Sequence, residues 1–503
     1  MESLKAFINE MNNIKDMIID YIDDDTPFPK FDMLDSVDYN YPRKLILIEI
    51  FHLIENIANN HFRCPSFFIK IERLIHYFEK ELNTNFSPNE IFKIFGSNKR
   101  ILLFLIQEKI LNVNNYICAE IEKNPDYNLY LKKPAKKDEI YEEKRKLGEN
   151  DNYICQLIQK DLIDDFIIFT NKTNIPLNSK IPSSLFETNQ FLIVNPPTFI
   201  EYAAFYGSMQ IIKYMVMNGI NMKPSIWLYA IHSNNPELIH YIEEKRVEPP
   251  DYSYLECLAE SMKCFWTNIT EYIKNNLITE EIDKYKLYEQ TIQYHNYAIP
   301  FEYSNENLLD YIKYDYPVFV YNYMNGIIGL KYKLNDFLNN KEINESKDEK
   351  NTLYSKEETP LLVAVENGNK EIVNLLASNR NIDINQILKY TEYTEYNTKT
   401  IEKTRTFLSV AVDSGNKDIV EVLLNNIDIN VNIKLTNVTD ILNMDDEDLG
   451  NILEPYLREI KEKDYYIEHF VFCEKRYDFE ISILFIFITF LILYFTNQIS
   501  KFC

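Results

Sequence analysis

The sequence predicts an all-α protein in which a helical N-terminal module precedes a solenoid of repeated helix pairs. Apolar residues in the N-terminal part recur at three- and four-residue spacing, as on the buried face of a helix. Farther along, two segments are near-copies of one another, which indicates a repeat architecture. Hydrophobic residues make up 46% and charged residues 26% of the 503 residues, so the chain can build a sizeable core.

Composition argues against several function classes. Only 9 of the 503 residues are glycine, which leaves little material for phosphate-binding loops. The formal net charge of −24 repels polyanions, so we expect no nucleic-acid partner. The seven cysteines are scattered without a CxxC motif, as is typical of reduced thiols. The first residues lack the basic and then apolar run of a cleaved leader, so we expect a cytoplasmic protein.

Residues 1–121 are predicted to form the helical N-terminal module. Proline divides its first part into separate helices, because proline disfavours helix at the preceding residue. The periodic apolar residues are Leu47, Ile50, Phe51, Ile54 and Ile57, then Ile101, Leu102, Leu105, Ile106 and Ile110, and the prolines are Pro27, Pro29 and Pro42. Residues 122–151 change to mixed charge. Their basic cluster at 132–137 is interleaved with acids, which favours a solvated linker or charged helix over a nuclear-localisation or nucleic-acid patch.

The two near-copies span residues 359–376 and 406–424, and each is followed by Asp-Ile-Asn, at 383–385 and 428–430. In the first copy, Thr359 and Pro360 are suited to begin a helix, since threonine caps free N–H groups and proline fits the first helical position. Gly368 and Gly415 end the first helix of each copy, where a sharp turn needs a positive φ.

This pattern resembles the ankyrin repeat, although Phe407 stands where proline is usual and neither copy has the family's histidine. The resemblance implies stacked antiparallel helix pairs joined by β-turn fingers. Gly368 and Gly415 are 47 residues apart, against a family period of 33. The excess lies within residues 387–404, in the finger, and a similar long connection at 346–358 precedes the first copy. We therefore expect ankyrin repeats over 346–436 with two extended fingers.

More divergent repeats are predicted upstream, at residues 199–214 and 226–241, with a third beginning at Cys257. This block, residues 195–275, resembles a domain of unknown function that precedes the repeats in a large trichomonad-type ankyrin family. The resemblance implies an interaction scaffold and supplies no catalytic residues. We assign the divergent region to 152–280 and a helical connection with a partial repeat to 281–345.

After an acidic helical segment at 437–478, residues 479–499 form a candidate transmembrane tail. Residues 481–495 are uncharged, and continuing to Ile499 gives a run just long enough to span a bilayer. Lys475 and Arg476 before it are expected to stay in the cytosol. The alternatives are a buried terminal helix or strand, or an AT-rich extension without repeat relatives that is misread as coding. Because so apolar a run is an aggregation hazard in water, membrane insertion of 481–499 is favoured.

The sequence contains no recognisable catalytic or metal-binding motif. We therefore expect no catalytic residues, no metal, no cofactor and no small-molecule substrate. His52 lies one helical turn before Glu55, but packing is the favoured interpretation. His232 and His240 could meet Cys257 or Cys264 to bind zinc, yet their spacing matches no zinc module. The acidic run at 445–448 lacks the calcium-loop pattern and is expected to be a solvated turn, while Trp227 and Trp266 are expected in the core.

These observations predict a non-enzymatic scaffold that binds a protein partner through the concave face and the fingers of the solenoid. One alternative is an anchor or receptor tethered to an intracellular membrane with its repeats in the cytosol. Another is an enzyme hidden in the N-terminal module, which would need a deep polar pocket within residues 1–120. The expected partner-binding residues, all placed at solvent-facing positions, are Tyr354, Lys356, Glu358, Glu366, Asn367, Asn369, Arg405, Ser409, Asp413, Ser414 and Asn416.

Overall fold

The computed structural model describes residues 2–429 except 25, 35–40, 65, 133–138, 280, 298–307, 326–341, 348–352, 395, 396 and 427. These residues belong to one compact unit, Met1–Asn430. The acidic segment 437–478, with its run at 445–448, and the candidate tail 479–499 lie outside the described residues. Within the described ranges, none of the helices has the length and apolar character needed to cross a membrane.

The N-terminal part is helical, as predicted. The long helix α2 is at its centre, and most of its residues are buried, including the carboxylates Glu49 and Glu55. Pro42 is its N-cap, so the proline ends the preceding loop where expected. The elements are α1 (Glu2–Asp23), η1 (Asp32–Leu34), α2 (Arg43–Asn60), α3 (Phe67–Tyr77), α4 (Glu79–Asn85), α5 (Pro88–Phe95), α6 (Lys99–Gln107) and α7 (Asn115–Glu122).

The charged segment 122–151 contains two helices, α8 (Pro125–Leu131) and α9 (Glu139–Leu147). It is not merely a solvated linker, because Tyr130 and Arg145 are buried. The Arg145 guanidinium binds both carboxylate oxygens of Glu142 at 2.7 Å and donates to the carbonyl of Tyr130 at 3.1 Å. The mixed charge of this segment predicts a solvated surface, but the hydrogen-bonding fork of arginine lets Arg145 serve inside the fold.

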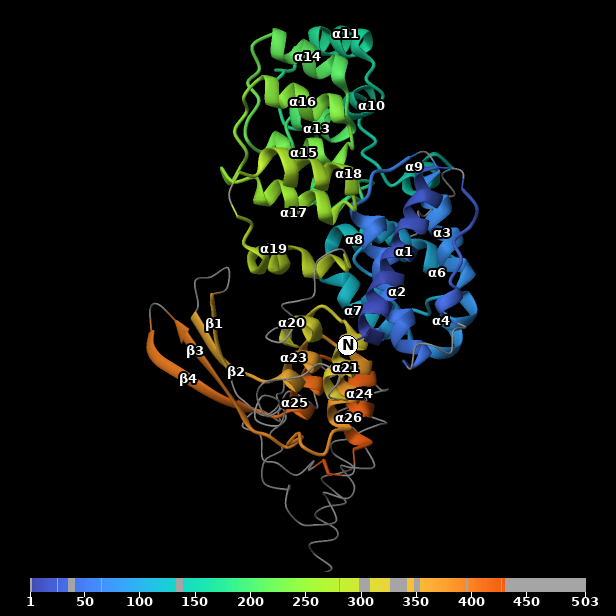
Figure 1. Ribbon diagram of the computed structural model, residues 1–503, viewed down its shortest axis with the longest axis vertical. Coiled ribbons are helices and arrows are strands. Elements are labelled where there is room, and N and C mark those ends of the chain that lie inside the picture. Colours follow the sequence, from blue (N-terminus) through green and yellow to red (C-terminus); the bar gives the residue numbers. More distant parts are fainter. Residues whose placement is uncertain are drawn as a thin grey trace, which may run out of the picture. The chain divides into compact units, whose positions relative to one another are not determined.

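Beyond α9 the chain forms successive helix pairs whose first helices stack in two runs, one through the first four pairs and one through the last three (Figure 1). Trp227 and Trp266 lie in their core, as predicted. The pairs are α10 (Tyr153–Gln159) with α11 (Ile163–Thr173), α13 (Phe199–Tyr206) with α14 (Met209–Met217), α15 (Ile226–His232) with α16 (Pro236–Glu244), α17 (Leu255–Lys263) with α18 (Thr267–Tyr272), α20 (Leu308–Lys313) with α21 (Pro317–Met324), α23 (Pro360–Glu366) with α24 (Lys370–Ala377), and α25 (Phe407–Asp413) with α26 (Lys417–Leu424). Four further elements interrupt or extend the series: α12 (Gln190–Val194), the π-helical turn η2 (Ile273–Leu277), α19 (Lys284–Thr291) and η3 (Ile292–Tyr294).

One residue with positive φ lies between the two helices of every pair named above. This conformation reverses the chain direction, and glycine adopts it without a Cβ clash. Several of these turns nevertheless use a residue other than glycine. The last two turns both use glycine, so the sequence pattern indicates them more clearly than the earlier ones. The residues and their φ angles are Asp161 (50°), Gly207 (69°), Asn234 (49°), Phe265 (62°), Asp315 (61°), Gly368 (67°) and Gly415 (71°).

The main departure from an all-α fold is a four-stranded antiparallel sheet in the order β1-β2-β3-β4. Its strands are β1 (Glu342–Lys347), β2 (Leu353–Glu358), β3 (Leu388–Thr394) and β4 (Asn397–Arg405). Strands β1 and β2 precede α23, and β3 and β4 precede α25, so each hairpin is an extended finger (Figure 1). The two fingers join through β2 and β3, where Ser355 pairs with Thr391. Ile343 and Asn344, expected after the second helix of a partial repeat, lie in β1, and the residues proposed for that helix are outside the described ranges.

Candidate functional site

The start of each first helix in the last two pairs is fixed by a threonine cap. The Thr359 hydroxyl accepts a hydrogen bond from the Leu362 amide at 3.3 Å, with Pro360 in the first helical turn, as predicted. Thr406 makes the corresponding bond to the Ser409 amide at 3.2 Å, and the Ser409 hydroxyl accepts in return from the Thr406 amide at 2.9 Å. This reciprocal capping box compensates for the missing proline at Phe407.

Several of the expected partner-binding residues are exposed at the ends of the first helices. Asn367, Asp413 and Ser414 face solvent just before the turns. Glu366 and Arg405 come from neighbouring repeats and form an ion pair at 3.6 Å. Glu358 is half-buried at the end of β2, the strand that also contains Tyr354 and Lys356. The structure therefore places these predicted residues along one series, from the fingers to the C-terminal ends of α23 and α25.

The expected exposure is wrong for Asn369, Ser409 and Asn416, which are all buried. Asn369 donates from its amide nitrogen to the carbonyl of Ile312 in the preceding pair. Ser409 closes the capping box of α25, and Asn416 caps α26 by accepting from the Asp418 amide at 3.2 Å. Polar residues at these positions satisfy backbone groups inside the stack, because a buried donor or acceptor must find a partner.

Helix α2 contacts the turns of successive helix pairs in reverse order along its length. Near its start, the Lys44 ammonium lies 2.7 Å from Glu371 in α24. Two turns farther on, His52 binds Asp315, in the turn between α20 and α21, at 3.1 Å. At the C-cap, His61 Nδ1 lies 2.9 Å from the carbonyl of Cys264, in the turn between α17 and α18. One N-terminal helix therefore braces the turns of three helix pairs, from α17–α18 to α23–α24.

Helix α5 extends this contact to the last pair. Ser87, the N-cap of α5, donates to the carboxylate of Asp418 in α26. Glu90 binds Lys44 at 2.7 Å and lies 3.6 Å from Lys370 of α24. Burial lowers the pKa of Lys44, but the Glu90 and Glu371 carboxylates outweigh it and raise the pKa above its ordinary value. The N-terminal helices therefore cover the starts of the second helices, α24 and α26.

A buried cluster of titratable groups lies where α2 and α5 meet the turn between α20 and α21. Asp315 binds His52 Nε2 and the Lys93 ammonium, each at 3.1 Å. Burial by itself raises the pKa of Asp315, but Lys93 and His52 outweigh it and hold that pKa well below its usual range. His295 stacks on His52 with ring centroids 4.5 Å apart, and burial lowers the pKa of His295 to about 4.

Glu49 lies beside the same cluster and accepts hydrogen bonds from the Tyr297 hydroxyl and the Val318 amide. Burial raises its pKa to about 8, so it is mostly protonated at neutral pH. The cluster contains convergent acids and bases that bind each other across an internal contact, and Lys93 and Asp315 also line a small cavity. The spacing of His52 and Glu55 in the sequence would allow them to pair, but in the structure they do not. Glu55 instead binds Asn59 and Ser97.

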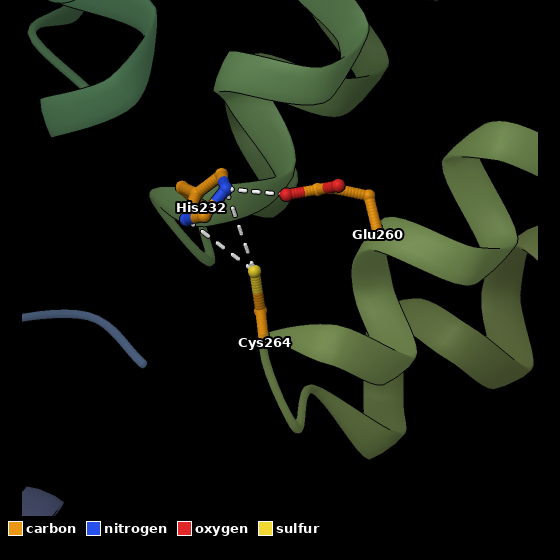
Figure 2. A group of neighbouring side chains, drawn as sticks. All are labelled: His232, Glu260 and Cys264. Carbon is orange, nitrogen blue, oxygen red and sulfur yellow. Dashed lines mark hydrogen bonds and ion pairs between the residues drawn. The ribbon is translucent and has the colours of Figure 1, made fainter. Parts of the chain in front are cut away.

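A second cluster brings together His232, Glu260 and Cys264 (Figure 2). His232 Nε2 lies 2.7 Å from Glu260 Oε1, and Cys264 Sγ lies 3.4 Å from His232 Nδ1. The order thiol, imidazole, carboxylate resembles that of a nucleophilic triad. However, Cys264 is fully buried, and burial raises its thiol pKa well above the ordinary value, so the thiol is not a reactive nucleophile.

Sequence reasoning named His232 and Cys264 as residues that could meet, and the structure brings them together. It missed Glu260, one helical turn before Cys264 on α17, a spacing that places both side chains on one face. His240 and Cys257 do not join the cluster. His240 pairs with Glu243 at 3.1 Å on the exposed side of α16.

Comparison with known families now identifies the last part of the described chain. Residues 330–434 match the family model for ankyrin repeats (3 copies). These residues are therefore similar to ankyrin repeats. They include both extended fingers and the pairs α23–α24 and α25–α26. A comparison with curated proteins finds no match to the chain. The ankyrin repeats point to a protein–protein interaction role, since such arrays present extended binding surfaces.

Proposed function

We propose that the chain is a non-catalytic scaffold that binds a protein partner through the extended fingers of its ankyrin repeats and the exposed ends of α23 and α25. The observation that supports this most is the joining of the two fingers into one sheet. An ordinary repeat has a short β-turn here, whereas β3 and β4 continue the ladder from β1 and β2. Extending consecutive fingers into a common sheet enlarges the surface ahead of Thr359 and Thr406, while Asp413 and Ser414 are exposed at the other end of α25.

The position of the N-terminal helices supports the same surface. Helices α2 and α5 bind the starts of α24 and α26 through Lys44, Glu90 and Ser87. A partner of any size would have to displace these contacts to reach the second helices there. The fingers arise at the opposite end of the first helices, ahead of Thr359 and Thr406. Partner binding at the fingers is therefore compatible with the internal contacts.

The test replaces residues 390–403 of the second finger with a short glycine-serine turn in the full chain. Partners captured by proximity labelling of the wild-type chain are expected to be lost from this variant, because half of the joint sheet is removed. Thermal unfolding should stay within a few degrees, since Thr406 and α25 are retained. Charge reversal at Lys213 and Glu237, an exposed pair on α14 and α16, serves as the matched surface control. Retention of all partners by the finger variant would contradict the proposal.

We also propose that the pairs from α10 to α18 are divergent repeats of the trichomonad-type ankyrin family, with its domain of unknown function at residues 195–275. The turns at Gly207, Asn234 and Phe265 have a positive φ, as do those at Gly368 and Gly415, and this likeness supports the relationship. A model built from homologues of residues 152–280 alone should retrieve ankyrin proteins. Retrieval of an unrelated helical family would contradict the assignment.

A second candidate function is that of a membrane-tethered anchor, which rests on the uncharged run at 481–495. In this proposal residues 479–499 insert into an intracellular membrane while the repeats bind their partner in the cytosol. Carbonate extraction of the full chain is compared with a chain ending at Asp478. The full chain alone is expected in the membrane pellet, and finding both chains in the supernatant would exclude the anchor.

A further inference from the structure

The donor atoms of His232, Glu260 and Cys264 lie within 4.8 Å of one another, inside the stack between α15 and α17. Zinc binds thiolate at about 2.3 Å and imidazole at about 2.0 Å, so tetrahedral ligands of these two kinds are about 3.6 Å apart. Cys264 Sγ lies 3.7 Å from His232 Nε2 and 3.4 Å from His232 Nδ1, so the thiol would have to turn toward the Nε2 side of the ring to share an ion with it. Glu260 Oε1 is closer to His232 Nε2, at 2.7 Å, and its longer side chain would withdraw slightly to admit an ion.

We propose that His232, Glu260 and Cys264 bind one divalent transition ion, zinc by the chemistry of the donors, with water at the fourth position. A thiolate, an imidazole and a carboxylate form a donor set suited to zinc, while magnesium and calcium prefer oxygen ligands alone. The ion would link the end of α15 to the end of α17, two neighbouring helix pairs. This site is independent of the partner-binding surface proposed above.

The surroundings hold the ring of His232 and the backbone of Cys264 in place. The carbonyl of Cys264 meets His61 Nδ1 at 2.9 Å, and the His61 ring lies against Trp266 with centroids 4.1 Å apart. The His232 ring packs against Phe191 and Phe205, at 4.4 and 4.9 Å between centroids. Metal sites depend on such outer contacts to orient their ligands before the ion arrives.

Charge within the site is compatible with a divalent ion. Burial favours the neutral thiol of Cys264 in the absence of metal, so ion binding would release the thiol proton. The Lys263 ammonium lies 3.0 Å from Glu260 Oε1. Once an ion takes one carboxylate oxygen, the other oxygen remains for Lys263. The positive charge of the buried Lys263 would then lower the affinity for the ion but would not prevent the ion from binding.

Cobalt(II) is the probe for this site, because a cobalt–thiolate bond gives charge-transfer absorption in the near ultraviolet and four-coordinate cobalt absorbs strongly in the visible. The full chain, stripped with a chelator under reducing conditions, is expected to bind one cobalt per chain and to lose both signals when zinc is added. Cys264→Ser should abolish the charge-transfer band and weaken binding at least tenfold. Cys257→Ser is the matched control, since Cys257 is also fully buried on α17 but lies outside the cluster.

Circular dichroism verifies that each variant is folded. If Cys264→Ser fails to fold, Glu260→Gln replaces it, because the amide can still hydrogen-bond His232 while the anionic ligand is lost. This variant is expected to bind cobalt at least tenfold more weakly. Absence of the charge-transfer band in the wild-type chain would overturn the proposal. An unchanged band in Cys264→Ser, or in a folded Glu260→Gln, would show an adventitious ion only and would also overturn it.

Discussion

Some single polar residues in this protein stabilise the fold, although their residue type suggests a surface position. Asn367 and Asn369 stand on either side of the same turn, and both looked like surface residues in the sequence. Asn367 is exposed and bonds within its own helix, at 2.7 Å to the carbonyl of Val363. Asn369 is 1% exposed and ties its repeat to Ile312 of the preceding pair. Identical side chains two residues apart therefore have different energetic roles.

Asn369→Ala is expected to lower the free energy of unfolding by about 1–3 kcal/mol, because the buried Ile312 carbonyl loses its side-chain donor and keeps only the 3.3 Å bond from the Asp315 amide. Asn367→Ala, the matched control, should change stability by less than about 0.5 kcal/mol, as is usual for an exposed site. Urea unfolding of the full chain measures both changes. Equal losses in the two variants would contradict the assigned role of Asn369.

Glu49→Gln tests the buried acid beside His295. Glutamate has an ordinary pKa of 4.5, and burial raises that of Glu49 to about 8 in the folded chain. Between these values the folded state holds a proton that the unfolded chain has lost. The contribution of Glu49 to stability is therefore complete below pH 4.5 and falls as the pH rises to about 8, by roughly 1.4 kcal/mol per unit.

The difference in unfolding free energy, Glu49→Gln minus wild type, should accordingly rise by about 2 kcal/mol between pH 6 and pH 8. Glutamine stays neutral, and its amide oxygen can still accept from the Val318 amide. Taking the difference removes the opposite effect of His295, whose lowered pKa reduces stability as the pH falls from 6.5 toward 4. Urea unfolding at several pH values gives the result, and parallel curves would disprove a raised pKa.

At the scale of elements, α2 is the main connection between the N-terminal helices and the repeats. It uses charged residues at one end and histidines farther along, so its contacts differ in kind from the apolar packing between repeats. Lys44 is surrounded by Glu90 and Glu371 from two different elements, and its side chain is 23% exposed. This partial burial makes the Lys44 contacts stronger than ordinary surface ion pairs.

Lys44→Met is expected to destabilise the chain by about 1–3 kcal/mol and to speed amide exchange at the start of α24, because two carboxylates lose their shared cation. Lys213→Met is the control. Its ammonium pairs with Glu237 at 2.9 Å, but both groups are largely exposed, so little change in stability is expected. Hydrogen exchange and urea unfolding measure the two effects. Unchanged exchange in α24 would argue against bracing by α2.

For the whole molecule, sequence patterns predicted most of the described architecture and less of its chemistry. Helical periodicity located α2 and α6, and threonine, proline and glycine located the ends of α23 because each is tied to a backbone conformation. The turns at Asp161, Phe265 and Asp315 were missed since their positive φ is enforced by packing and not by residue type. Likewise, Asp315 joins His52 and Lys93 across more than 200 residues, a contact that no local pattern contains.

The candidate binding surface was predictable in its location and less so in its members. The 47-residue spacing pointed to an enlarged finger, and the structure shows the finger as β3 and β4. The pairing of β2 with β3 was not predictable, because register depends on how two hairpins meet in space. Buried caps such as Ser409 and Asn416 look like surface residues until their backbone partners are known.

The bracing of the turns by α2 has a consequence for how such a chain can diversify. An added segment at the turns next to Asp315 or Gly368 would collide with α2 or α5, so mutation there is restricted to substitutions of similar size. The fingers have no comparable restriction in the described residues, and that is where the long insertions stand. The fingers are therefore the place in the described residues where a new recognition sequence can be added, whether it arises in evolution or is grafted in the laboratory.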